Sequence, residues 1–260
     1  MATRDTPFPP GTPCWVDLMS SDTARSRTFY SALLGWEFTE PNIEFGGYAN
    51  ASLEGHVVAG LMAKEAGVPF PDCWSTYVST ADAAATIAKV ADAGGTVRFG
   101  PDDVADLGRL GMLLDPAGAA IGVWQPGTHT GFQRYNEPGT VCWNELHSKD
   151  FPASTAFCAD VFGFTYEVVG DSDEFRYSTF SVDGGSESVG GVMDSSAFLP
   201  AEVPSHWAVY FCVADADAAT ARAADLGATV NRGPEDTPYG RMSDLLDPTG
   251  AGFKLIQLPG

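Results

Sequence analysis

Two short segments of this chain carry an acidic residue two positions after a tryptophan. Trp15 precedes Asp17, and Trp143 precedes Glu145 and His147. Side chains alternate between the two faces of a β-strand, so each tryptophan is expected to share a face with the acid that follows it. Carboxylates and imidazole can exchange protons, and indole supplies an apolar wall. We therefore expect Asp17, Glu145 and His147 as candidate catalytic groups, with both tryptophans lining a small-molecule pocket.

These acids also have a structural interpretation. Asp17 and Glu145 could pair with Arg109, Arg241 or Lys254 and simply satisfy the interior, because buried carboxylates usually have partners. Both arginines follow a glycine. They could hold a substrate carboxylate through two hydrogen bonds, or form a salt bridge that stabilises a turn. If the two acids came close together, one of their pKa values would rise.

The chain repeats itself at an offset of 128 residues. Residues 11–18 align with residues 139–146, and the turn at 115–118 meets its counterpart at 247–250 at a slightly larger offset. Ordered matches over a whole half of a chain indicate a duplicated structural unit. Two copies of this length also make a solenoid unfavourable, since such stacks usually need more repeats.

The repeat predicts the domain boundaries. An N-terminal extension covers residues 1–10, and the first module covers residues 11–126. A linker at 127–138 leads to the second module at 139–258.

Each copy shows the same order of predicted elements. An alternating strand is followed by a helix with Asp22 or Asp150 as its N-cap and Gly35 or Gly163 at its end. Three further strands, a second helix and a closing hairpin around Asp-Pro-x-Gly complete the copy. The predicted fold class is α+β, with two tandem βαβββ-type modules that pair into a β-sheet cup with helices outside.

The segment Phe-Tyr-x-x-Leu-Leu-Gly-Trp at 29–36 and the Gly-Arg-(five residues)-Asp-Pro-x-Gly pattern at 108–118 resemble the vicinal oxygen chelate superfamily. This superfamily includes glyoxalase I, extradiol dioxygenases, fosfomycin-resistance enzymes and bleomycin-resistance proteins. The resemblance covers nearly the whole chain, twice. The two tryptophan-containing opening strands further resemble a two-module actinobacterial subgroup labelled as glyoxalase or hydroxylase, which includes a mycobacterial antigen.

The resemblance implies where a metal would be bound in metal-dependent members. Its three ligand positions fall on residues that are poor ligands for a divalent cation in both modules: Trp15 and Trp143, Ser75 and Ala208, and Gly122 and Lys254. We therefore expect no metal and no other cofactor.

A displaced metal site is the alternative to this expectation. His206 begins another strand and could join Glu145 and His147 two residues away from the implied positions. Met19 and Cys73 hold the matching places in the first module, and a histidine satisfied within the core is commoner than a ligand. We expect His206 and Lys254 to contact the ligand instead. Three aromatic residues are expected to extend the pocket wall: Tyr48, Trp124 and Tyr177.

Composition limits the possible partners. The chain has 260 residues, 44% of them hydrophobic, and a formal net charge of -20. A surface of this sign repels phosphate, so nucleic acid and anionic membranes are poor partners. The N-terminal residues lack the apolar core of a signal peptide, which predicts a cytoplasmic protein. The five cysteines lack Cys-x-x-Cys spacing, which argues against a disulfide framework or a structural zinc site.

Three functions are compatible with these features. An aromatic and acidic cup without metal ligands favours a metal-independent protein that binds a small aromatic or carbonyl-containing molecule for sequestration or detoxification. The alternative is an enzyme, either a cofactor-free isomerase or lyase or a glyoxalase-like aldehyde detoxifier. A pure interaction protein would fill the cup with its own side chains. Two modules in one chain form an internal pseudo-dimer, which predicts a monomer or a homodimer.

Overall fold

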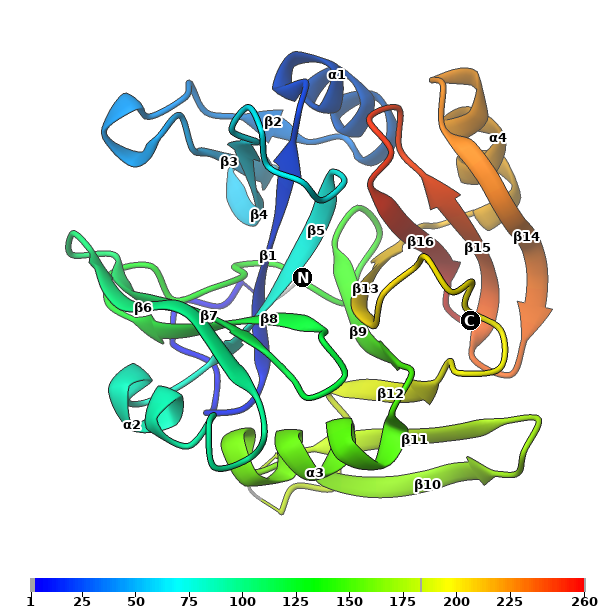
Figure 1. Ribbon diagram of the computed structural model, residues 1–260. Coiled ribbons are helices and arrows are strands. Elements are labelled where there is room, and N and C mark those ends of the chain that lie inside the picture. Colours follow the sequence, from blue (N-terminus) through cyan, green and yellow to red (C-terminus); the bar gives the residue numbers. More distant parts are fainter. Residues whose placement is uncertain (1–2, 183, 260) are drawn as a thin grey trace.

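A computed structural model describes residues 3–182 and 184–259, so Met1 and Ala2 of the predicted extension lie outside the described residues. Each module contains one mixed sheet (Figure 1). The strands of the first module are β1 (Pro13–Ser20), β2 (Glu37–Phe38), β3 (Ala49–Leu53), β4 (His56–Ala63), β5 (Cys73–Ser79), β6 (Thr96–Val104), β7 (Gly108–Leu114) and β8 (Ala120–Pro126). Its helices are α1 (Thr23–Leu34) and α2 (Ala83–Ala88), with a 3₁₀ turn at Ile43–Phe45.

The second module repeats this order. Its strands are β9 (Val141–Ser148), β10 (Thr165–Asp171), β11 (Arg176–Ser181), β12 (Gly190–Asp194), β13 (His206–Cys212), β14 (Thr229–Thr237), β15 (Gly240–Leu246) and β16 (Gly252–Gln257). Its helices are α3 (Phe151–Phe162) and α4 (Ala216–Asp225). Each module is therefore two successive βαβββ units. The predicted α+β fold class, with duplicated modules, is confirmed.

The first helix of each module begins and ends at the predicted residues. The Asp22 carboxylate accepts a hydrogen bond from the backbone N–H of Arg25 at 3.0 Å, and Asp150 caps α3 in the same way. Gly35 and Gly163 end these helices in the left-handed conformation, with φ of 76° and 75°. A capping carboxylate at the start and a glycine in the left-handed conformation at the end thus set both boundaries locally.

One strand in the second half of each sheet is absent from the sequence-based prediction. β6 and β14 are the outermost strands, and their side chains are mostly exposed. An edge strand of this kind needs no continuous apolar face, and both contain a Gly-Pro pair that interrupts the alternation. The short β2 and its counterpart β10 were also not predicted as separate strands. The pattern of hydrophobic residues therefore under-counts the strands.

The first strand of each module lies at the centre of its sheet. The strand order is β2-β3-β4-β1-β5-β8-β7-β6, and the second sheet has the equivalent order. β1 pairs with β4 in parallel and with β5 antiparallel. Side chains on β1 and β9 consequently have neighbours from strands on both sides, which is the position a site residue needs.

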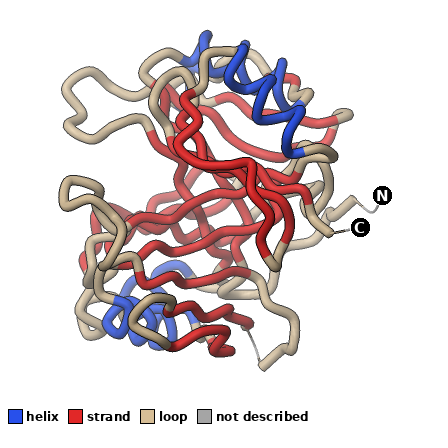
Figure 2. The backbone as a smooth tube through the Cα atoms, turned by 90° about the vertical axis from the view of Figure 1, so that its right-hand side faces the viewer, coloured by secondary structure: helices blue, strands red, loops and turns tan. Residues whose placement is uncertain are grey.

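The two modules share their hydrophobic core. Tyr30 and Phe29 of α1 pack against Phe211 and Phe253 of the second sheet, with ring centroids 6.2 and 5.9 Å apart. The Tyr30 hydroxyl donates to the buried Asp247 carboxylate at 3.1 Å. α1 accordingly lies beside α4 and β16 in Figure 1, and Figure 2 shows helices at two opposite ends with the strands between them. Each module thus completes the core of the other.

The predicted extension and linker both pack against the first module. Phe8 is 7% exposed and meets Phe132 edge-on, with centroids 6.1 Å apart. The backbone N–H of Phe132 donates to the Cys14 carbonyl of β1 at 2.9 Å. No helix within the described part of the chain has the length and apolar character that crossing a bilayer requires.

Candidate functional site

Alternation along the first strand separates the acids from the core. Asp17 lies against Tyr48, whereas Val16 is opposite Thr76, whose hydroxyl donates to Asn144 of the second module at 2.9 Å. The helix-side faces therefore meet at the module junction. We call the other face of each sheet its cup, so that β1 contributes to the first cup and β9 to the second.

The two cups are separate, so the acids are not brought together. The groups around Asp17 all belong to the first module, and those around Glu145 all belong to the second. Both tryptophans were expected to line one pocket, but they lie in different cups because the modules pair through their helix sides. Each acid instead has its own environment.

In the first cup, hydrogen bonds link the predicted residues Trp15, Tyr48 and Asp17. The Trp15 indole N–H donates to the Tyr48 hydroxyl at 2.9 Å, and that hydroxyl donates to Asp17 Oδ2 at 3.4 Å. Gly60 makes room for this arrangement, because a Cβ at this position would lie 1.8 Å from the Tyr48 hydroxyl oxygen. Trp15 and Asp17 thus lie on the same face of β1 and both contact Tyr48.

Asp17 is a buried carboxylate without a cationic partner. Its side chain is 4% exposed, and Oδ1 accepts no hydrogen bond among the described residues. Burial raises the pKa of Asp17 to about 6, and the nearby hydroxyls of Tyr77, Tyr48 and Ser75 offset this only in part. The carboxyl group can therefore change its protonation state near neutral pH.

The second cup has the same aromatic frame. The Trp143 indole donates to the Tyr177 hydroxyl at 3.2 Å, and the Tyr210 hydroxyl donates to Glu145 Oε1 at 2.7 Å. Gly191 gives Tyr177 its space, since a Cβ there would lie 2.1 Å from the hydroxyl oxygen. Tyr77, the first-module counterpart of Tyr210, was not among the predicted site residues, although each of these two tyrosines lies directly opposite a cup tryptophan.

Charged groups distinguish the second cup from the first. Lys254 Nζ lies 3.0 Å from the Tyr210 hydroxyl, 3.2 Å from His147 Nε2 and 3.8 Å from Glu145 Oε1. His147 Nε2 is also 2.9 Å from Glu145 Oε1. Burial alone would raise the pKa of Glu145, but the His147 hydrogen bond and the Lys254 charge hold it at about 2. Glu145 is therefore a carboxylate with its own cation.

His147 is held on both ring nitrogens. Its Nδ1 lies 3.2 Å from the Ser195 hydroxyl, and its ring stacks on that of His206 with centroids 5.2 Å apart. Its Nε2 contacts both an acceptor, the Glu145 carboxylate, and a donor, the Lys254 ammonium group. The structure thus places four of the candidate site residues close together: Glu145, His147, His206 and Lys254.

The second cup is a poor fit for a divalent metal. Lys254 Nζ already lies among the oxygen and nitrogen atoms that would have to surround a cation. Within residues 3–182 and 184–259, no group of three or more His, Cys, Asp or Glu side chains is placed to hold a metal ion. An ammonium group repels metal cations and has no lone pair to donate. The chemistry of the donor set therefore argues against the displaced metal site.

The two predicted arginines lie outside the cups. Arg241 makes two contacts with Asp217 of α4, at 2.6 and 2.9 Å, which places it on the helix side of β15. Arg109 pairs with Asp103 of β6 at 2.8 Å. Its neighbour Gly111, two residues along β7, faces α2. These arginines therefore form structural salt bridges and are not placed to hold a substrate carboxylate in either cup.

The linker supplies a residue that sequence reasoning missed. This residue is His129, whose ring meets Trp15 edge-on with centroids 4.4 Å apart, and burial lowers its pKa. The predicted Trp124 holds this segment, because its indole donates to the His129 carbonyl at 2.9 Å. Only the closeness of the linker to a strand end in sequence hinted at this contact.

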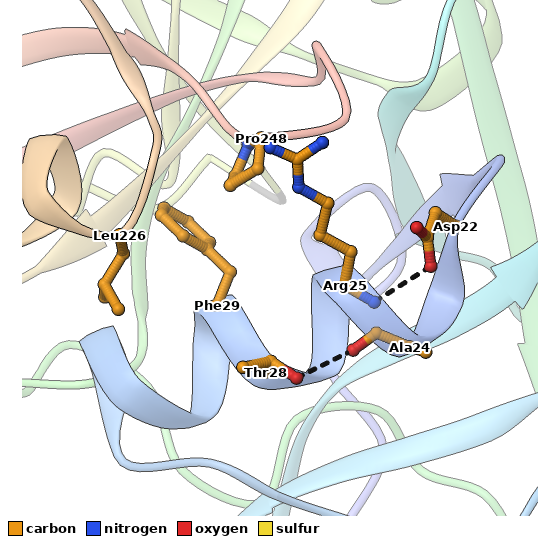
Figure 3. Close-up of a pocket in the computed structure, with 7 residues that line it drawn as sticks. All are labelled: Asp22, Ala24, Arg25, Thr28, Phe29, Leu226 and Pro248. Carbon is orange, nitrogen blue, oxygen red and sulfur yellow. Dashed lines mark hydrogen bonds between the residues drawn. The ribbon is translucent and has the colours of Figure 1, made fainter.

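Two open cavities lie outside the cups. One of about 320 Å³ lies between α1 and the second module; Figure 3 shows its lining residues Asp22, Ala24, Arg25, Thr28, Phe29, Leu226 and Pro248. A second, of about 290 Å³, lies where α2 meets the end of α3. In the first cavity the Asp22 carboxylate caps α1 and the Thr28 hydroxyl donates to the Ala24 carbonyl. The candidate chemistry is therefore in the cups, whose floors are covered by tyrosine rings.

The amino-acid sequence matches a protein-family model and several named relatives. The family model described as Glyoxalase/Bleomycin resistance protein/Dioxygenase superfamily matches residues 14–123 and 141–255. The chain is 38% identical over 252 residues to "Putative glyoxylase CFP32" of Mycobacterium tuberculosis, covering 95% of each sequence. It is 36% identical over 272 residues to "Anthracycline biosynthesis protein DnrV" of Streptomyces peucetius, covering 97% of this chain and 95% of that protein.

Solved structures share the fold at low identity. The Mn(II)-bound glyoxalase from Novosphingobium aromaticivorans superposes with a TM-score of 0.66 at 18% identity, over 95% of this chain and 82% of that one. The 2,3-dioxygenase LapB from Pseudomonas sp. KL28 gives 0.64 at 16% identity, over 99% and 96%. Two matched modules and full-length relatives establish that this chain belongs to the glyoxalase/bleomycin resistance/dioxygenase superfamily.

Proposed function

We propose that this protein is a metal-independent member of its superfamily that binds a small aromatic or carbonyl-containing molecule in the second cup, for sequestration or detoxification. The position of Lys254 carries this proposal. Its ammonium group lies against Tyr210, His147 and Glu145, where it supplies from within the chain the positive charge that a bound metal would provide.

The accessible groups of the second cup define what such a ligand contacts. The Lys254 side chain is 15% exposed, and Trp143 is half-buried, whereas Glu145 is 5% exposed. A ligand oxygen would accept a hydrogen bond from Lys254, and an aromatic portion would pack on Trp143. Two relatives named for anthracycline biosynthesis fit this preference, because anthracyclines combine fused aromatic rings with carbonyl groups.

The second candidate is an enzyme that uses the same cup. The observation favouring it is the shared contact of His147 Nε2 with Glu145 and Lys254, which suits a cofactor-free isomerase or lyase, or glyoxalase-like conversion of an aldehyde. Here His147 would move the proton while Glu145 stabilised the imidazolium. A bell-shaped pH–rate profile that is lost in Glu145→Gln, with binding retained, supports catalysis over sequestration.

The proposal extends to the location and the oligomeric state of the protein. We propose that it is cytoplasmic. We also propose that it is a monomer, because the modules already bury each other's helix-side faces. The net charge of -20 disfavours nucleic acid and anionic membranes as partners. Light scattering after gel filtration tests the monomer; a concentration-independent dimer would contradict it.

Two measurements test the function. Phenylglyoxylate, an aromatic keto acid, serves as the probe, with Trp fluorescence quenching as the readout. We expect Lys254→Met to weaken binding at least about tenfold through loss of a charge-assisted hydrogen bond. Asp17→Asn, in the other cup, is the matched control and should bind as the parent protein does.

Metal analysis of the untagged protein is the second measurement. The proposal predicts less than stoichiometric metal and unchanged probe binding after chelation. Stoichiometric metal whose removal abolishes probe binding would overturn metal independence. Equal binding by Lys254→Met and the parent protein would remove the second cup as the binding site.

A further inference from the structure

The two cups share one aromatic frame but differ in charge. In each, a tryptophan N–H donates to a tyrosine hydroxyl, at 2.9 Å in the first cup and 3.2 Å in the second. In each, that tyrosine lies beside the acid of the central strand. The duplicated frame therefore allows the two sites to be compared position by position.

The cation of the second cup has no counterpart in the first. Strand pairing sets Lys254 of β16 opposite Tyr210, and the equivalent pairing in the first module sets Gly122 of β8 opposite Tyr77. Glu145 thus receives an ammonium group from the neighbouring strand, while the position that would serve Asp17 has no side chain. The first cup therefore keeps the tryptophan–tyrosine frame and an acid, but it has Met19 and Cys73 in place of the two histidines and no ammonium group at the position of Lys254.

Asp17 has no substitute cation. Its Oδ2 accepts a hydrogen bond from the Tyr48 hydroxyl, and none of the salt bridges between described residues includes it. Lys64, at the end of β4, is engaged by Asp72 at 2.6 Å. Asp17 is 4% exposed and its Oδ1 has no hydrogen bond among the described residues, so its ionised form is costly unless a cation pairs with it.

We propose that the first cup binds the protonated amino group of a small molecule, with the ammonium paired to Asp17 and bordered by the surrounding aromatic rings. Trp15, Tyr48 and Tyr77 supply these rings, and aromatic faces attract ammonium groups. The amine enters over Gly122, which requires rotation of the Tyr77 ring, because that ring now covers the glycine within 2.0 Å of a Cβ position. This site is distinct from the second cup and needs neither Glu145 nor Lys254.

Benzylamine tests the inference, with benzyl alcohol as its neutral analogue. Titrations are followed by calorimetry at about pH 8, where both the amine and the Asp17 carboxylate are charged. We expect saturable binding of one benzylamine, weakened at least about tenfold in Asp17→Asn because a buried ion pair is lost. Benzyl alcohol should show no comparable binding.

Two further readings locate the site. Glu145→Gln is the matched control in the other cup and should bind benzylamine as the parent protein does. The indole N–H signal of Trp15 in an NMR spectrum, assigned by its loss in Trp15→Phe, should shift on titration. This second reading does not depend on the folding of Asp17→Asn.

Several outcomes would overturn the inference: absence of saturable benzylamine binding, an unmoved Trp15 signal, or equal binding by Asp17→Asn and the parent protein. Equal loss in Glu145→Gln would assign the amine to the second cup. Phenylglyoxylate binding is tested with Lys254→Met, and amine binding is tested with Asp17→Asn. The failure of one proposal can therefore be distinguished from the failure of the other.

Discussion

Replacing Asp17 with asparagine should change the free energy of unfolding in a pH-dependent way. The gain of the variant over the parent protein should be larger at neutral pH than at acidic pH. An asparagine keeps the size of the side chain and cannot ionise. In the folded protein the pKa of Asp17 is raised from 3.8 to about 6, which corresponds to about 3 kcal/mol. Between these two values the unfolded chain has released the proton and the folded chain still holds it. Folding stability from this group is therefore lost as the pH rises.

Most of that change, about 2 kcal/mol, should develop between about pH 4 and about pH 8. Urea unfolding followed by Trp fluorescence at a series of pH values measures it, with the free-energy difference between variant and parent as the quantity of interest. Asp92→Asn, at an exposed position, is the control and should show a flat difference. A difference for Asp17→Asn that is independent of pH, or that shrinks as pH rises, would refute the burial argument.

Three other perturbations follow from the packing. Gly191→Ala should destabilise the fold by about 1–3 kcal/mol by displacing the Tyr177 ring. Gly252→Ala is the control, because the nearest atom to a Cβ there is 3.8 Å away, and it should not destabilise the fold. Equal unfolding free energies for the two variants would contradict this prediction. Lys254→Met should lower the free energy of unfolding by about 3 kcal/mol at neutral pH, because Glu145 stays buried without its cation. The parent protein should lose stability as the pH falls from 4.5 towards 2, and the variant should lose less. Unchanged acid unfolding would count against the pairing of Lys254 with Glu145. The first module expressed alone should lack a cooperative unfolding transition, because Tyr30 and its neighbours pack on the second sheet; a sharp transition would show an independent core.

Local signals made much of the fold predictable. The aspartate N-caps and glycine C-caps act within one helical turn, so Asp22 and Gly35 could be identified from sequence alone. Strand alternation likewise placed Trp15 and Asp17 on one face. The outer strand β6 was missed because its pairing with β7 stabilises a segment whose own pattern is polar and interrupted by Gly-Pro.

Long-range contacts were less predictable. Alternation says which residues share a face, but it does not say which faces of two modules meet. The helix sides meet through Thr76 and Asn144, so Asp17 and Glu145 came to lie in different cups. His129 reaches Trp15 only because the linker folds back along the first module. Such contacts depend on tertiary packing, which leaves no periodic signal in the sequence.

The divergence of the two acids follows from one position in the sheet. Glu145 and Asp17 are both buried on the central strand beside a tyrosine, yet the pKa of one is held at about 2 and that of the other is raised to about 6. Burial acts in the same direction on both, so the difference arises from His147 and Lys254. A lysine could not simply be introduced at residue 122, because the Tyr77 ring occupies that space. The aromatic ring and the glycine therefore form a single packing unit, and the duplicated module has kept one cup with its own cation and one without.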